Sequence, residues 1–349
     1  MIINVYDLLD VYNNEVSKNT KNKRKVYNFE KHKMIHLYNI KNKIENNKYE
    51  INNYNIFNIY EPKLRIIMSL SIENRIVDHY LSKYILLPKL DKYLDIRNVA
   101  SRKNMGMSYG VKLLKKYIEK NKKYDNIYVL KIDISKYFYS IDHKVLKRML
   151  LGKLNNDEYN LVSKFIDSTD YDYVNKRIEE IKNKLKTITT NSYRLNEIDE
   201  IPYYLNGKGL TIGNVSSQIL SIFYLSELDF YIINNLKCKY MIRYCDDIII
   251  LHNDREYLYE VFDKIKDKLK EYKLRINTKK SFITRLDKGV IFCGNYIKID
   301  NKKTNINKCN ANKIRIKRNI KKINKKFIEN KIIYKSYFNS INCYRSMKF

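Results

Sequence analysis

Three aspartates have a spacing and a context that would allow metal chemistry. Asp133 lies near the end of an apolar run, IYVLKIDI (127–134), whereas Asp246 and Asp247 are adjacent in RYCDDIII (243–250). Adjacent like charges repel, and burying a carboxylate is costly unless a cation balances it. Two Mg²⁺ ions about 3.5–4 Å apart would remove that cost and would support in-line phosphoryl displacement. Singly, each signal is weak, because aspartates at strand ends and in turns are ordinary.

The flanking residues predict the elements that must position these acids. The run 127–134 is typical of a strand that is buried on both faces. MIRY before and IIIL after Cys245-Asp246-Asp247 predict two strands joined by a tight hairpin. That hairpin would place both of its carboxylates at an exposed tip.

The length of 349 residues predicts two or three subdomains rather than a single core. An alternating pattern predicts a strand within 49–60, and helical periodicity predicts a helix over 72–93 that is interrupted at Pro88. The run 216–233 is apolar almost all round, as in a buried helix. Residues 170–205 are polar and indicate an insertion or an exposed arm, and 305–331 predicts a basic helix.

The formal net charge of +31 favours a polyanionic partner. The competing interpretation is a basic surface that only confers solubility. The five cysteines include no C-x-x-C pair, so neither a zinc site of that type nor a disulfide framework is indicated. No apolar run has the length of a membrane span, and the first residues do not resemble a secretion signal. We therefore expect a cytoplasmic protein with reduced thiols and no membrane partner.

Together with the acids, further motifs give the chain a resemblance to reverse transcriptases, the palm-fold RNA-directed DNA polymerases. Five segments follow the order of that family: 130–143, 209–229, 243–250, 274–283 and 292–297. The resemblance implies an α+β right-hand fold with an antiparallel palm sheet and a short helical thumb. The implied parts are a basic N-terminal extension (1–48), fingers (49–126), palm (127–290) and primer grip with thumb (291–349).

The resemblance also implies roles for particular residues. Asp133, Asp246 and Asp247 would hold two Mg²⁺ ions, with Mn²⁺ as an alternative and with help from the backbone carbonyl of Ile134. Lys280 would be the general acid for the pyrophosphate leaving group, although Lys279 competes for that role.

A second group of residues would bind the substrates. Phe138 would exclude a 2′-hydroxyl, unless it is only a core aromatic. The other residues implied to bind the incoming dNTP are Lys63, Arg65, Ile134, Ile212, Gly213 and Gln218. The primer grip would contain Phe292, Cys293 and Gly294. Arg75 matches a family element only in part, because Asn74 replaces an acid. The alternative role for Arg75 is a structural one. Ser216 or Ser217 would cap the helix that follows Gly213.

The sequence around the expected nucleotide pocket also indicates a branch of the reverse transcriptase family. Ile212-Gly213 and Ser217-Gln218 resemble the diversity-generating retroelement branch, whose enzymes copy adenines unfaithfully. A phage-defence reverse transcriptase would share the chemistry, and a non-catalytic RNA-binding protein is a third interpretation. The expected partners are an RNA template, a DNA or RNA primer and dNTPs, and the branch allows for a small basic accessory protein.

Overall fold

The computed structural model describes residues 1–51, 53–60, 63–329 and 331–346, and the chain forms two compact units. Unit 1 contains Met1–Ile96, Ile134–Phe230 and Asp267–Arg275. Unit 2 contains Arg97–Asp133, Tyr231–Lys266 and Ile276–Phe349. Each unit is therefore assembled from segments that are distant in sequence. The mixture of helices and antiparallel sheets confirms the expected α+β class.

Unit 1 begins with helices that bury an apolar face. Leu8 and Val11 of the first helix are fully buried, and this helix packs against α5 (Ile72–Tyr80). The expected polar extension is therefore a folded part of unit 1. Its helical segments are α1 (Val5–Val11), the π-helix η1 (Tyr12–Val16), α2 (Ser17–Asn19), α3 (Lys23–Glu30) and α4 (Lys33–Glu45).

A two-stranded antiparallel sheet precedes α5. Its strands are β1 (Asn55–Ile59) and β2 (Arg65–Ser69), paired so that Ile59 faces Arg65. The helical path continues from α5 through η2 (Leu81–Leu86), α6 (Leu87–Leu90) and η3 (Asp91–Tyr93). The expected interruption at Pro88 is wrong, because this proline lies in the first turn of α6, where a missing N–H costs little.

The rest of unit 1 is helical. The stretch 170–205 contains α11, whose residues Val174 and Ile178 are fully buried and which packs against β1. The expectation of an exposed arm is therefore wrong, since the apolar face of this helix covers the small sheet. The helical segments here are α8 (Tyr137–Ser140), α9 (His143–Leu150), α10 (Asn156–Asp167), η4 (Ser168–Asp170), α11 (Asp172–Thr187), α12 (Ser192–Asp199), α13 (Val215–Tyr224) and α14 (Ser226–Phe230).

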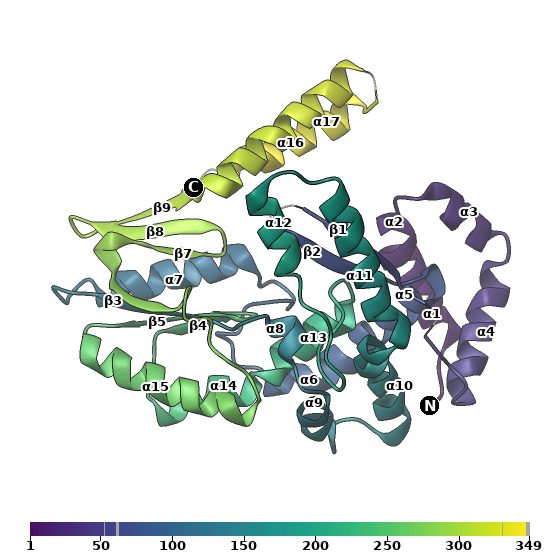
Figure 1. The fold of residues 1–349 in the computed structure, drawn as a ribbon, viewed down its shortest axis with the longest axis horizontal. Helices are drawn as coiled ribbons and strands as arrows, with labels where there is room; N and C mark the ends of the chain where they lie inside the picture. Colours follow the sequence, from purple (N-terminus) through teal and green to yellow (C-terminus); the bar gives the residue numbers. More distant parts are fainter. Residues whose placement is uncertain (52, 61–62, 330, 347–349) are drawn as a thin grey trace. The chain divides into compact units, whose positions relative to one another are not determined.

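Unit 2 contains a four-stranded antiparallel sheet in the order β4-β5-β3-β6, of which Figure 1 labels β3, β4 and β5. The strands are β3 (Tyr128–Asp133), β4 (Met241–Tyr244), β5 (Asp247–His252) and β6 (Phe282–Arg285). Helix α7 (Met107–Asn121) packs on β4 and β5, with Leu114 and Ile118 in the shared core. Two further helical segments flank the β4–β5 hairpin in sequence, η5 (Tyr231–Asn235) and α15 (Arg255–Glu271). Helix α15 begins in unit 2, and its last residues belong to unit 1.

The C-terminal part of unit 2 is a second sheet followed by a helical hairpin. After η6 (Leu286–Lys288), strands β7 (Val290–Phe292), β8 (Asn295–Asp300) and β9 (Lys303–Lys308) pair in sequence order. Helices α16 (Asn310–Ile328) and α17 (Tyr334–Ser346) pack against each other, with the ring centroids of Phe327 and Tyr337 4.3 Å apart. The expected basic helix is present as α16, but residues 305–308 are strand.

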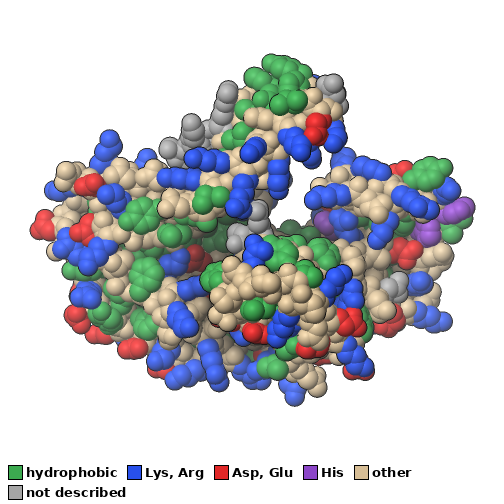
Figure 2. Space-filling view, turned by 45° about the horizontal axis from the view of Figure 1, so that its top comes forward, with side chains coloured by type: hydrophobic (Ala, Val, Ile, Leu, Met, Phe, Trp, Pro, Cys, Tyr) green, Lys and Arg blue, Asp and Glu red, His purple; other side chains and the backbone are tan. Residues whose placement is uncertain are grey.

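Helix α16 has no buried residue among those described, and Lys and Arg side chains gather along the arm that it forms with α17 (Figure 2). This is the form expected of a solvated face or a face that follows a polyanion. Within the described residues, no helix is both long enough and apolar enough to cross a bilayer.

Candidate active site

The antiparallel register of unit 2 brings the three aspartates together. Asp133, the last residue of β3, pairs with Asp247, the first residue of β5. Directly opposite residues of antiparallel strands have Cβ atoms about 4.5–5.5 Å apart. Cys245 and Asp246 form the turn between β4 and β5, and Cys245 takes a φ of +57° there. The hairpin expected from the sequence is confirmed, with three carboxylates at one end of the sheet.

Asp247 lies in a less exposed place than the sequence predicts. Its side chain is only 25% exposed, and its Oδ2 lies 3.3 Å from Nζ of Lys131. Burial raises the pKa of Asp247 to about 7, the Lys131 ammonium opposes this rise, and the charges of Asp246 and Asp133 add to it. The exposed-tip prediction is therefore wrong for Asp247, because this residue begins a buried strand instead of belonging to the turn.

Asp133 is held by the segment that precedes β6. Its carboxylate is 18% exposed and lies 3.3 Å from Nζ of Lys280, while Asn277 donates its side-chain amide to Oδ1 at 3.2 Å. The Asp133 backbone N–H donates to Oγ of Ser281, and its carbonyl accepts the N–H of Asn277. The structure thus places Lys280 beside the acid cluster, and its role as general acid stays a prediction.

The donor set fits divalent cations that prefer oxygen ligands. Oδ1 of Asp247 is buried and has no hydrogen-bond partner among the described protein atoms, so this oxygen is available to a cation. Carboxylate oxygens are the ligands that Mg²⁺ prefers, and a cation would lower the cost of ionising Asp247. Ile134 follows Asp133 in the chain but belongs to unit 1, and the role of its carbonyl stays a prediction.

Two residues beside the acids were missed at the sequence level. Lys131 donates to the carbonyl of Ile291 in β7 at 2.5 Å as well as contacting Asp247. Arg243 is fully buried and donates from Nη1 to the carbonyl of Cys245 at 2.9 Å, which supports the turn that carries Asp246. Each of these two residues is a single cation within an apolar strand. Because an unpaired charge is rarely buried, this position in the sequence could have indicated a nearby polar or charged partner.

The expected primer-grip residues form the connection between β7 and β8. Cys293 (φ +47°) and Gly294 (φ +71°) make a two-residue turn of the kind that suits a tight hairpin. Phe292 is fully buried in the core beneath α7, so its packing is structural. Burial raises the pKa of the Cys293 thiol to about 12, with a further contribution from Asp247.

In unit 1, Phe138, Ile212 and Gly213, three of the residues expected to bind the dNTP, belong to or contact the loop that ends at Gly213. The carbonyl of Ile212 accepts the N–H of Met68 in β2 at 2.9 Å. Gly213 has a φ of +134°, and a Cβ there would lie 2.8 Å from the Met68 carbonyl oxygen. The carbonyl of Phe138 accepts the N–H of Leu210 at 2.7 Å, which joins this residue to the same loop.

The remaining expected residues of this group are accessible. Lys63, Arg65 and Gln218 are exposed, and Phe138 is partly exposed. The neighbouring Tyr137 is the buried aromatic, and its hydroxyl donates to the carbonyl of Ser221. The core interpretation of Phe138 is therefore disfavoured, while its contact with a sugar stays a prediction.

The first N–H groups of α13 are bound by Asp78, which lies far from them in the sequence. The buried carboxylate of Asp78 accepts the N–H of Val215 at 2.8 Å and that of Ser216 at 3.2 Å. Burial raises the pKa of Asp78, and these hydrogen bonds oppose the rise. Neither serine acts as the expected N-cap residue, because Asn214 occupies that position. Arg75 donates to Oγ1 of Thr20 and has the structural role that the sequence allowed.

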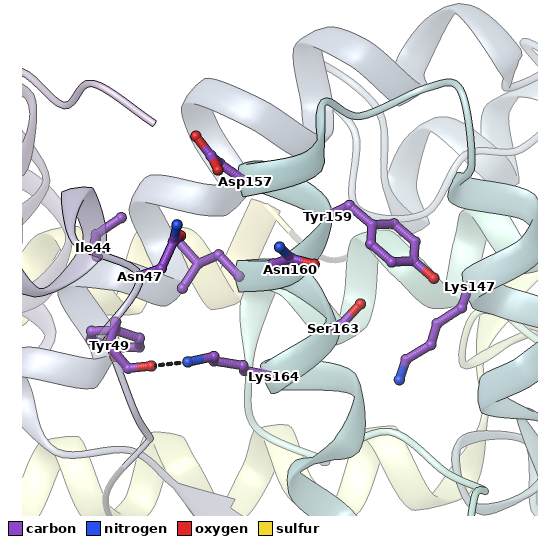
Figure 3. A pocket seen from close by; sticks show the side chains of 10 residues that line it. Ile44, Asn47, Tyr49, Lys147, Asp157, Tyr159, Asn160, Ser163 and Lys164 are labelled. Carbon is purple, nitrogen blue, oxygen red and sulfur yellow. Dashed lines mark hydrogen bonds between the residues drawn. The ribbon is translucent and has the colours of Figure 1, made fainter.

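A cavity of about 390 Å³ lies elsewhere in unit 1, between the end of α4 and α10 (Figure 3). Lys147, Tyr159 and Ser163 are among the side chains that line it. It contains none of the residues predicted to bind substrate or metal, so we do not assign it to the candidate active site.

Comparison with known proteins supports the polymerase interpretation at the family level. The profile of the family described as reverse transcriptase (RNA-dependent DNA polymerase) matches residues 61–307, more than half of the chain. A search of curated proteins gives no match.

Similar solved structures include telomerases. One is a Candida albicans telomerase in complex with the TWJ fragment of telomeric RNA (15% identity, TM-score 0.48), where the alignment covers 77% of this chain and 46% of that one. Two are apo telomerases of Candida tropicalis, each 16% identical over 74% of this chain. The form truncated from its C-terminal domain has a TM-score of 0.44 with 55% of its chain covered, and the other has 0.46 with 49% covered. The chain thus spans about half the length of these structures.

The family profile spans the segment that contains all three aspartates, the turn at Gly213 and the hairpin at Gly294. This extent agrees with the order of motifs in the sequence and with the antiparallel sheet that carries the acids. The chain belongs to the reverse transcriptase (RNA-dependent DNA polymerase) family.

Proposed function

We propose that the protein extends a primer 3′ end on an RNA template by metal-assisted nucleotidyl transfer. The observation that carries the proposal is the pairing of Asp133 with Asp247 across β3 and β5, with Asp246 in the adjoining turn. Such a cluster has no stabilising role by itself, because its acids repel and burial raises the pKa of Asp247. The cluster is explained if the residues serve as ligands for divalent cations.

The proposed reaction is attack of the primer 3′-hydroxyl on the α-phosphorus of a dNTP, with pyrophosphate as the leaving group. Two Mg²⁺ ions held by the three aspartates would stabilise the charge that develops on the reacting oxygens. Lys280 lies beside Asp133 and would donate a proton to pyrophosphate. In the same scheme, Lys63 and Arg65 would bind the triphosphate, and Arg is suited to bidentate phosphate contacts.

The scheme also assigns parts to the two other groups of expected residues. Ile212, Gly213 and Gln218 would contact the incoming nucleotide, and the partly exposed Phe138 would exclude a 2′-hydroxyl. The hairpin at Cys293 would hold the primer end. We keep the assignment of fingers, palm and thumb to 49–126, 127–290 and 291–349 within this proposal, with the basic α16 following the template–primer backbone.

The decisive experiment is primer extension by the purified protein on an RNA template with Mg²⁺. Asp246→Ala is expected to abolish incorporation while preserving the circular dichroism spectrum and RNA binding. Asp125→Ala, which changes an exposed aspartate ahead of β3, is the matched control and should retain activity. Synthesis by the Asp246→Ala variant at the wild-type rate would refute the assignment. RNA binding with no extension by the wild type under any metal would favour a non-catalytic RNA-binding protein.

For the biological role we propose a diversity-generating retroelement enzyme, with phage defence as the second candidate. Ile212 presents no polar amide next to Gly213, so a hydrogen bond near the incoming nucleotide is absent and discrimination would fall. Ile212→Gln is expected to lower misincorporation opposite template adenines relative to the wild type. An unchanged error spectrum on a defined RNA would remove this support and leave the defence role as the alternative.

A further inference from the structure

A second group of side chains with atoms that can ligate a metal lies in unit 1, separate in sequence from Asp133, Asp246 and Asp247. It consists of His143 at the start of α9, Asp167 at the end of α10 and Asp170 in η4. Nδ1 of His143 lies 3.4 Å from Oδ1 of Asp167 and 3.4 Å from Oδ2 of Asp170. The three atoms all lie within 4.8 Å of one another.

The hydrogen bonding of His143 fixes which ring nitrogen is free. Nε2 lies 2.7 Å from the carbonyl oxygen of Gly209, which can only accept, so Nε2 carries the proton. Nδ1 makes no hydrogen bond to a described protein atom although the side chain is only 3% exposed. A buried imidazole with one nitrogen anchored to a carbonyl and the other unpartnered is the arrangement found in metal-ligating histidines.

The two carboxylates each have one oxygen anchored and one directed at Nδ1. Oδ2 of Asp167 lies 2.6 Å from Nζ of Lys147, and Oδ1 of Asp170 accepts the N–H of Gly207 at 3.0 Å. Burial raises the pKa of Asp167, but contacts with His143 and Lys147 outweigh this and lower it overall. Both carboxylates are thus positioned by neighbours that leave the oxygen facing His143 available.

We propose that His143, Asp167 and Asp170 bind one divalent transition-metal ion, with Zn²⁺ as the preferred ion and water in the fourth position. Ligand atoms about 2.1 Å from a tetrahedral Zn²⁺ lie about 3.4 Å apart. The separation of Nδ1 from each carboxylate oxygen is 3.4 Å, so the imidazole edge of the site needs little rearrangement. An imidazole ligand favours Zn²⁺ over Mg²⁺ or Ca²⁺, which prefer oxygen donors alone.

The ion would join the ends of two helices to the loop that leads into the α13 turn. The His143 N–H donates to the carbonyl of Gly207 at 2.9 Å, and its ring contacts the carbonyl of Gly209. The bound metal would therefore fix α9, the end of α10 and the segment Gly207–Gly209 to one point. This role is structural and is independent of the proposed polymerase chemistry.

The alternative is a doubly protonated His143 that pairs with both carboxylates and needs no metal. To separate the two, untagged protein carrying Asp246→Asn and Asp247→Asn, which removes metal binding at the catalytic acids, is stripped with a chelator and dialysed against Zn²⁺. We expect one tightly bound zinc per chain by elemental analysis. We also expect Zn²⁺ to raise the melting temperature, because it binds only the folded state.

Asp170→Asn in the same background is the informative variant. The asparagine oxygen can still accept from Gly207, so the fold is maintained while a charged ligand is lost. Its zinc affinity should fall by at least about 10–100-fold, the loss that follows removal of an outer-shell partner of a metal ligand. The zinc-induced rise in melting temperature should disappear. Asp172→Asn makes the same change at an exposed position two residues away and should bind zinc like its parent.

Two results would overturn the proposal. One is a parent protein that retains no stoichiometric zinc after dialysis, which would leave the protonated His143 pair as the explanation. The other is equal zinc affinity in the Asp170→Asn and Asp172→Asn variants, which would place the bound ion elsewhere.

Discussion

Gly213→Ala tests whether the turn before α13 depends on close approach to β2. A Cβ at this position would lie 2.8 Å from the carbonyl oxygen of Met68 and 3.3 Å from Cγ2 of Ile67. The first contact is to backbone, so no side-chain rotation relieves it. The adjacent Ile212 carbonyl accepts the Met68 N–H at 2.9 Å, and any displacement of the turn would stretch that bond.

The expected loss of stability has two parts. The φ of +134° at Gly213 is rarely adopted by residues with a side chain, and such backbone strain costs about 1–3 kcal/mol. Steric overlap of a new methyl in a packed site adds about 1–3 kcal/mol. Gly152→Ala is the matched control in the same unit, because Gly152 also has a positive φ (+72°) but a Cβ there meets nothing within 4 Å. The control should therefore show strain alone, about 1–2 kcal/mol.

Urea unfolding followed by circular dichroism measures both variants against the wild type. Gly213→Ala is expected to lose about 1–3 kcal/mol more free energy of unfolding than Gly152→Ala, which is the overlap term. Under the proposed function it should also raise the KM for dNTPs, whereas Gly152→Ala should leave that KM unchanged. Equal destabilisation by the two substitutions would show that β2 does not pack against this turn as described.

Three further predictions concern charged side chains that contact a charged or polar partner. Lys131→Met should lower the free energy of unfolding without divalent cations by about 1–3 kcal/mol in urea titrations, because the Asp247 carboxylate loses its cation. Arg243→Lys should cost about 1–3 kcal/mol in the same assay, since the shorter side chain cannot keep the buried hydrogen bond to the hairpin turn. Burial raises the pKa of Asp142, but Lys273 and an N-cap hydrogen bond lower it overall. The ionised carboxylate therefore stabilises the fold at pH values above the ordinary pKa of 3.8. This contribution is lost as the pH falls through the lowered pKa. Asp142→Asn keeps the cap, and the melting-temperature difference from the wild type should therefore shrink between about pH 6 and about pH 3.5.

The hairpin that carries Asp246 was predictable because its signals are local. Alternating and continuous apolar runs specify strands, and the short polar interval between MIRY and IIIL specifies a tight connection. The antiparallel sheet that carries the acids was expected from the resemblance to reverse transcriptases, because local patterns do not say which strands pair. Local patterns therefore predicted the hairpin, and the order of the family motifs predicted the sheet that contains it.

Other features depend on contacts between segments that are far apart in the chain, and local patterns do not contain them. Asp78 caps α13 across more than a hundred residues, and in sequence it is only an acid on a helix. The sequence of 170–205 is mostly polar, but helix α11 within it has a narrow apolar face. That face is buried because it packs against β1. Pro88 illustrates the same limit, because its effect depends on the helical turn into which it falls.

The charges around Asp133 and Asp247 show that burying these acids does not by itself stabilise the fold. Lys131 contacts Asp247 and Lys280 contacts Asp133, so each of these two carboxylates has a cation beside it. The pKa of Asp247 rises to about 7 under this balance, which means that the folded protein tolerates its ionised form poorly. The free-energy cost of removing two charges from water is offset only when the two charges attract each other in good geometry and their remaining hydrogen-bonding atoms have partners. Since one oxygen of Asp247 has no hydrogen-bond partner among the described atoms, the site is complete only with added positive charge, which is what the adjacent acids of RYCDDIII require.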